Sequence, residues 1–160
     1  MPTVRDRLAA IGLELPGPAA ALGDYVAAVR HGDLIFTSGQ LPFSDGELMA
    51  VGPVGEVVSL ERAQECAARA ALNALAAASS VCDLDAVARV VKLVGYVACA
   101  HDFTQQPAVV NGASAIMAVA FGDAGKHARE AVGVAALPLG SPVEVSIILG
   151  MVPTGIGVQD

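Results

Sequence analysis

The stretch from Ser59 to Ser80 constrains the fold most, because it predicts one long helix that must lie against an apolar surface. Ser59 is a suitable N-cap, and the helix would end at Ser79 and Ser80. Its polar side chains recur at helical spacing along one stripe, formed by Arg62, Glu65, Arg69 and Asn73. Most other positions are Ala, Leu or Cys. Since small alanines allow a close approach, we expect this helix to cover one face of a sheet.

Strand patterns flank that helix on both sides. Before it, two strands are predicted around a turn at His31–Asp33, and then a loop or short hairpin around Asp45–Gly46. After it, the predicted elements are a buried strand in 86–100, a helix from Ala108 to Phe121, and strands in 130–137 and 143–152. The order β-β-α-β-α-β-β predicts an α+β fold, a mostly antiparallel sheet with two helices packed on one face.

The N-terminus predicts a short helix, Val4 to Ile11, capped by Thr3 and stopped by Gly12. Residues 12–23 contain two prolines and three glycines and predict a connector. No linker divides residues 24–160. We therefore expect the 160 residues to form a single domain, 1–160.

The composition restricts the partners. Apolar residues make up 54% of the chain, above the usual range of roughly 45–50%, so an additional buried surface between subunits is expected. The net charge is −7 and Lys and Arg do not cluster, which argues against nucleic acid. No signal-peptide pattern or long uncharged apolar run occurs, so we expect a cytoplasmic protein with no membrane partner. Three cysteines without C-x-x-C spacing favour neither a zinc site nor a disulfide framework.

Glu144 is a lone carboxylate in the apolar strand pattern VEVSIIL. Alternation places Glu144 and Ser146 on one face of that strand and the valines and Ile147 on the other. One interpretation is an edge-strand glutamate that faces solvent. The other is a carboxylate that lines a cleft, where partial burial would tune it for proton transfer.

Arg129 stands at the start of the preceding strand pattern and allows three interpretations. It can be a solvated strand end, or a structural ion-pair partner of Glu130 or Glu144. It can also hold a substrate carboxylate through two parallel hydrogen bonds. His127, two residues before it, could border the same site.

Two further segments stand out. Thr37–Gln40 ends a predicted strand, and Gly39 would allow the backbone and the Ser38 hydroxyl to approach a ligand carboxylate, although an ordinary turn explains the segment equally well. Asn111–Gly112 falls inside a predicted helix, where both residues are poor helix formers. Such a conflict indicates a functional or packing demand at that position.

Together these pieces resemble the Rid family, the reactive intermediate deaminases, also called YjgF-type proteins and earlier described as L-PSP endoribonucleases. The resemblance extends from about Gly23 to Val152. It is carried by the segments GDYVAAVRHGDLIFTSGQLP, VVKLVGYVACAHDF, VVNGASAIM and HAREAVGVAALPLGSPVEVSIIL. The last segment is the most specific, with Arg129 followed by V-x-V-x-x-LP and then by Glu144 at the family spacing. Residues 1–22 resemble an N-terminal extension found in a longer subgroup.

The resemblance implies a chorismate-mutase-like protomer that assembles as a homotrimer with clefts between subunits. The implied reaction is hydrolysis of enamine or imine intermediates, such as 2-aminoacrylate, to 2-keto acids and ammonia, without metal or organic cofactor. Arg129 would clamp the substrate carboxylate and Glu144 would handle water and protons. The residues implied to border the ligand are Tyr25, Ser38, Gly39 and Asn111. Ala131 stands where many members have a cysteine, which puts the substrate range in question.

Two other functions are compatible with the same residues. A non-catalytic trimeric module that binds small carboxylates would use Arg129 without needing Glu144. The older endoribonuclease label has weak support in the sequence, because the chain is acidic and has neither a His pair nor a basic stripe.

Overall fold

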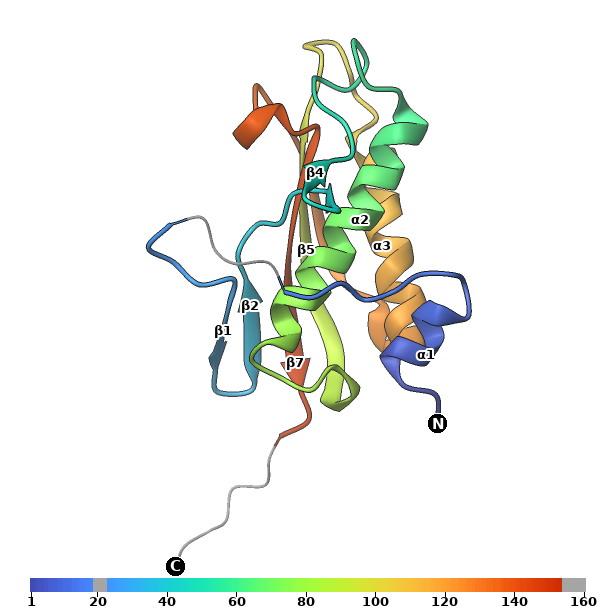
Figure 1. Ribbon diagram of the computed structural model, residues 1–160, viewed down its shortest axis with the longest axis vertical. Helices are drawn as coiled ribbons and strands as arrows, with labels where there is room; N and C mark the ends of the chain where they lie inside the picture. Colours follow the sequence, from blue (N-terminus) through green and yellow to red (C-terminus); the bar gives the residue numbers. More distant parts are fainter. Residues whose placement is uncertain (19–22, 154–160) are drawn as a thin grey trace, which may run out of the picture.

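A five-stranded sheet forms the centre of the fold in a computed structural model that describes residues 1–18 and 23–153 (Figure 1). Its strands lie in the order β1-β2-β7-β5-β6. Their bounds are β1 Ala28–His31, β2 Leu34–Thr37, β5 Val87–Ala98, β6 Ala128–Val134 and β7 Val143–Met151. All neighbouring strands are antiparallel except β5 and β6, which run parallel. The predicted mostly antiparallel sheet is confirmed.

Two long helices, α2 (Leu60–Ser79) and α3 (Gln106–Phe121), cover one face of this sheet, as predicted (Figure 1). The Ser59 hydroxyl accepts the N–H of Arg62 at 3.1 Å and caps α2. The face of α2 toward the sheet and α3 consists almost wholly of buried alanines and leucines. Helix α3 begins two residues before the predicted Ala108, because Pro107 is tolerated in a first helical turn.

Alternate side chains of the strands form the core beneath these helices. On β7 the buried residues are Val143, Val145, Ile147, Leu149 and Met151. Gly112 on α3 completes the layer, since a Cβ there would collide with the backbone carbonyl of Gln64 on α2. The glycine that is a poor helix former is therefore required by close helix packing. Residues 106–125 are long and apolar enough to span a membrane by composition, but within the described chain they form the core helix that packs on α2 and β5.

The opposite face of the sheet is not covered by any helix of the described chain (Figure 1). We call it the open face. Its residues alternate with the core positions and include Glu144, the charged pair Lys92 and Glu130, and Val29, Leu34, Phe36, Val94, Tyr96, Val132, Ser146 and Ile148. Val29 and Val132 are 47% and 44% exposed. An apolar sheet face of this kind is typical of a surface that another protein copy covers.

The remaining elements match their predictions with shifted ends. Helix α1 (Val4–Ala9) carries the predicted capping box of Thr3 and Asp6 but stops two residues before Ile11. Its Arg7 donates to the carbonyl of Ala120 at 3.0 Å, which ties the N-terminal segment to α3. Strand β6 starts two residues before Glu130 and ends at Val134, because its partner strand β5 ends opposite it at Ala98.

The predicted hairpin around Asp45–Gly46 is also confirmed. It consists of β3 (Phe43–Ser44) and β4 (Glu47–Leu48). Asp45 and Gly46 both have positive φ, 53° and 86°, as a two-residue hairpin turn requires. This hairpin lies beside α2 and brings Phe43 to the rim of a cavity that Glu144 also lines.

Candidate active site

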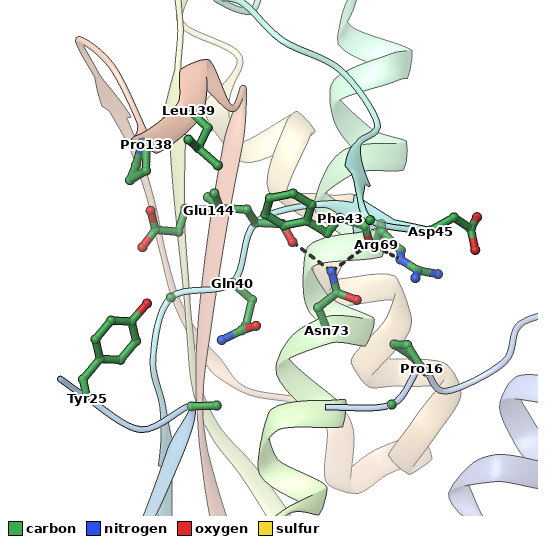
Figure 2. Close-up of a pocket in the computed structure, with 15 residues that line it drawn as sticks. Pro16, Tyr25, Gln40, Phe43, Asp45, Arg69, Asn73, Pro138, Leu139 and Glu144 are labelled. Atoms are coloured by element: carbon green, nitrogen blue, oxygen red, sulfur yellow. Dashed lines mark hydrogen bonds between the residues drawn. The ribbon is translucent and has the colours of Figure 1, made fainter. Parts of the chain in front are cut away.

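Glu144 faces a cavity of about 590 Å³ at the end of strand β2 (Figure 2). We call it the Glu144 cavity. Its wall comes from several separate parts of the chain, and its principal residues are Tyr25, Gly39, Gln40, Leu41, Phe43, Arg69, Asn73, Pro138, Leu139 and Glu144. Tyr25 and Glu144 lie on one side of β2 and β7, whereas Arg69 and Asn73 come from α2 on the other side. The cavity therefore extends past the end of β2.

Glu144 is half-buried on β7, which lies in the middle of the sheet between β2 and β5. The interpretation of an edge-strand glutamate is therefore wrong. Its carboxyl has no hydrogen-bond or ion-pair partner among residues 1–18 and 23–153. Desolvation by burial raises the pKa of Glu144 above its ordinary value of about 4.5. A carboxyl in this state exchanges a proton more readily near neutral pH than a solvated one.

Gly39 makes room for this carboxyl. A Cβ at position 39 would collide with the carboxyl oxygen of Glu144, so only glycine allows the two residues to lie as they do. Gln40 fixes the approach, because its backbone exchanges two hydrogen bonds with Val145, at 2.8 and 3.0 Å. The close approach that Gly39 allows is thus between the backbone and the Glu144 side chain.

Tyr25 and Ser38 take different places. Tyr25 lines the Glu144 cavity and is 55% exposed, so its ring stands at the cavity mouth (Figure 2). Ser38 donates its hydroxyl proton to the carbonyl of Val26 at 2.7 Å and anchors the segment that carries Tyr25. Its hydroxyl proton is therefore already engaged within the chain.

Sequence reasoning did not identify the α2 side of the cavity. The Arg69 guanidinium donates to the carbonyl of Phe43 at 2.7 Å, and the Asn73 amide donates to the carbonyl of Leu41 at 2.8 Å (Figure 2). These bonds hold the loop before β3 against α2. The polar stripe of α2 was the available signal, but nothing in its spacing showed that two of its members reach a cavity wall.

Arg129 lies at the start of β6, an edge strand, and points toward α3. Its Nη1 donates to Asn111 Oδ1 at 2.7 Å and to Ser114 Oγ at 3.2 Å. Arg129 and Asn111 are thus brought together. A second cavity of about 350 Å³, the Arg129 cavity, is lined by Ser114, Ala118, Gly125, Lys126, His127 and Arg129. His127 borders Arg129 as expected, and Ser114 had not been identified.

The proposed ion pairs of Arg129 do not form in the described chain. Glu130 instead binds Lys92 on the open face at 2.6 Å. Glu144 lines the other cavity. The interpretation of Arg129 as a structural ion-pair partner is therefore wrong, and its guanidinium contacts only neutral acceptors.

A single chain does not join Arg129 and Glu144 in one pocket. Strand β5 separates their strands, and the paired positions place Arg129 level with Leu93 and Ile147 on the helix-covered face. Glu144 lies three residues farther along β7 on the opposite face. From the strand geometry their Cα atoms are roughly 14 Å apart. Within one chain the two groups therefore do not form one site, and a site that contains both would need a second copy.

Comparison with known proteins identifies the family. The family model described as "YjgF/chorismate mutase-like, putative endoribonuclease" matches residues 5–150. The chain is 39% identical to Protein TCP17 of Trypanosoma cruzi over 91% of its length and 92% of the relative. The chain therefore belongs to the YjgF/chorismate mutase-like family, the superfamily that contains the Rid proteins.

Two solved structures support the same assignment. The protein Atu1372 of Agrobacterium tumefaciens, of unknown function, has a TM-score of 0.85 at 39% identity, covering 93% of this chain and 92% of its own. A protein of Shewanella oneidensis described as a putative endoribonuclease has a TM-score of 0.90 at 32% identity, covering 93% and 99%.

Proposed function

We propose that the protein hydrolyses reactive enamine or imine intermediates, of the 2-aminoacrylate type, to 2-keto acids and ammonia. The proposal is carried by the state of Glu144. Its carboxyl is half-buried, has no partner in the described chain, and lines a cavity in which the missing side chain of Gly39 leaves room for it. Such a group is suited to accept a proton from water and return it. Arg129 is held by neutral residues, so its charge is available for a carboxylate.

The chemistry needs few groups. A 2-imino acid already reacts with water, so the site must bind its carboxylate and direct a water molecule to C2. Glu144 as carboxylate takes a proton from that water as the C2–O bond forms. Glu144 as carboxylic acid then returns the proton to the nitrogen, which gives a carbinolamine. A second proton passes from the carbinolamine hydroxyl through Glu144 to the nitrogen as the C2–N bond breaks and the C2=O bond forms, so ammonia leaves with the keto acid. No step requires a metal or an organic cofactor.

The proposal includes assembly as a homotrimer whose sites lie between subunits. Two observations support it: the apolar open face, and the separation of Arg129 from Glu144 within one chain. A second copy on the open face would bury residues such as Tyr96 and Val132 and could bring its own Arg129 to the Glu144 cavity. A cytoplasmic location is part of the proposal, supported by the free thiols of Cys66, Cys82 and Cys99.

Co-expression of two variants tests both the proposed hydrolysis and the proposed site between subunits. 2-Aminoacrylate or 2-iminobutyrate is generated enzymatically, and keto-acid release is followed with wild type, Glu144→Gln, Arg129→Ala and a co-expressed mixture of the two variants. We expect each single variant to lose nearly all activity and the mixture to regain part of it, because mixed trimers contain intact sites. Folded wild type without acceleration over buffer would reject the deaminase, and a mixture as inactive as its components would reject the shared site.

A binding module for small carboxylates is the second candidate. It is supported by the same arrangement of Arg129 and Asn111 and makes no use of Glu144. Calorimetry with 2-ketobutyrate on wild type and Glu144→Gln, together with the hydrolysis assay, separates the two. Equal affinity with no hydrolysis by wild type favours the module. An endoribonuclease is not favoured, since the chain has net charge −7 and no basic stripe.

A further inference from the structure

Behind Arg129, on the side of α3, lies a chain of hydrogen bonds that the proposed chemistry does not use. His127 Nδ1 is 2.6 Å from the carbonyl oxygen of Gly125, and its Nε2 is 3.1 Å from Ser114 Oγ. Ser114 Oγ is in turn 3.2 Å from Arg129 Nη1. This series of hydrogen bonds therefore ends at the Arg129 guanidinium, which binds the substrate carboxylate in the proposed function.

The chemistry of the two ends sets the direction of these bonds. The Gly125 carbonyl can only accept, so His127 Nδ1 carries a proton, and a ring with its single proton on Nδ1 accepts at Nε2. The Arg129 guanidinium can only donate, so Ser114 Oγ accepts from Nη1. The Ser114 hydroxyl proton is then free for His127 Nε2. With these directions, every group in this series of hydrogen bonds satisfies both of its neighbours.

Gly125 is a firm anchor for this chain. The residue is buried at the end of the 3-10 turn η2 (Gly122–Gly125), and a Cβ there would collide with the carbonyl of Met117 on α3. The turn is therefore packed directly on the helix that carries Ser114 and Asn111. The two acceptors of Nη1 and the anchor of His127 are thus all fixed relative to one rigid helix.

The bonds leave one edge of the guanidinium available. Nη1 has two protons, which Asn111 Oδ1 and Ser114 Oγ accept at 2.7 and 3.2 Å. No acceptor for Nε or Nη2 of Arg129 occurs in residues 1–18 and 23–153. These two nitrogens form the remaining pair of parallel donors, and such a pair matches a carboxylate.

We infer that Ser114 and His127 are positioning residues that, with Asn111, hold Nη1 of Arg129 so that its Nε/Nη2 edge faces the substrate carboxylate. The inference rests on the proposed function only in naming the carboxylate as the group held. It assigns to Ser114 and His127 no contact with substrate.

Binding and kinetics test this inference with Ser114→Ala. Ser79→Ala on α2 is the matched control, since within the described residues the Ser79 hydroxyl bonds only the backbone carbonyl of Ala76 on its own helix. We expect Ser114→Ala to weaken 2-ketobutyrate binding by about tenfold and to raise KM more than it lowers kcat. Ser114→Thr, which keeps the hydroxyl, should restore most of the affinity. In an Arg129→Ala background Ser114→Ala should have no further effect, because the two act through one group.

A spectroscopic measurement tests the direction of the bonds without any ligand. Nitrogen NMR of His127 should show Nδ1 protonated and Nε2 unprotonated at neutral pH, with exposed His101 as the internal comparison. An Nε2-protonated ring, unchanged affinity of Ser114→Ala, or an additive loss in the Arg129→Ala background would each overturn the inference.

The two proposals fail in different ways. Wild type that binds 2-ketobutyrate but hydrolyses no imine rejects the deaminase and leaves the positioning role intact if Ser114→Ala weakens binding. Active wild type with unaffected Ser114→Ala rejects the positioning role alone. Wild type that does not bind 2-ketobutyrate overturns both, since Arg129 then holds no carboxylate.

Discussion

Arg129 and Glu144 lie two strands apart in one sheet, yet their surroundings differ in nearly every respect. Arg129 is on an edge strand, and neutral oxygens of Asn111 and Ser114 accept both protons of one of its nitrogens. Glu144 is on a central strand, half-buried, and has no partner in the described chain, so desolvation raises its pKa. The first group is held in place with its charge intact. The Glu144 carboxyl has no partner that stabilises its charge, and such a group is suited to proton transfer and not to binding a substrate carboxylate.

Replacement of the carboxyl should have the largest effect. In Glu144→Gln the amide keeps the shape but cannot accept a proton from water, so we expect kcat for imine hydrolysis to fall by about 10³-fold. The affinity for 2-ketobutyrate, measured by calorimetry, should change little. A variant that loses affinity and keeps kcat would reverse the roles that the comparison assigns.

Replacement of the guanidinium should act on binding. Lysine in Arg129→Lys retains the charge but has a single nitrogen, so it cannot donate to Asn111 and form two parallel hydrogen bonds with a carboxylate at the same time. We therefore expect kcat/KM to fall by about 10²-fold, mostly through a higher KM. Steady-state kinetics over a range of substrate concentrations separate the two parameters. Arg5→Lys, at the exposed N-terminal helix, is the control and should match wild type. A fall confined to kcat would contradict the gripping role.

Displacement of Glu144 without changing it tests how much its position matters. A methyl group in Gly39→Ala would take the place of a carboxyl oxygen, so the side chain must turn away. We expect kcat to fall by about tenfold or more with the secondary structure retained in circular dichroism. Full activity in Gly39→Ala would show that the carboxyl can work from another place.

The smallest effect concerns stability. Because the folded protein binds the Glu144 proton more tightly than the unfolded chain does, burial of this carboxyl lowers stability as pH rises from about 4.5 through the folded-state pKa. Glu144→Gln removes that cost. We expect its Tm to exceed that of wild type by a few degrees at most at pH 7, and the difference to vanish below about pH 4.5. If the Tm difference between Glu144→Gln and wild type does not change with pH across this range, Glu144 is not desolvated in the folded protein.

Much of the fold could be predicted from local patterns. Ser59, the alanine-rich run and Asp45–Gly46 each determine their own segment, since caps, periodicity and turn dihedrals depend on a few neighbouring residues. Element ends were less certain. Strand β6 ends at Val134 because its partner strand β5 ends opposite it at Ala98. Such pairing between distant segments cannot be read from a local sequence pattern.

The sequence predicts Tyr25, Ser38, Gly39, Asn111, Arg129 and Glu144 as site residues, and their roles stay predictions, whereas their arrangement could not be predicted. Tyr25, Gly39 and Glu144 share one cavity, and Arg129 and Asn111 meet at the other. Arg69 and Asn73 were recognised only as a helix stripe. Ser114 was missed because an isolated serine in a helix has no distinctive spacing, and it becomes significant only where the chain returns to place His127 and Arg129 beside it.

The sequence by itself determined which residues share a face of β7 and which form the polar stripe of α2, because side-chain periodicity is a local property of the backbone. Only the tertiary structure decided that Glu144 lies on the central strand, that Arg129 lies on an edge, and that the two point to opposite faces. Strand order and register come from pairing between distant segments, so the distance between two functional groups is set by contacts that neither group's neighbours encode.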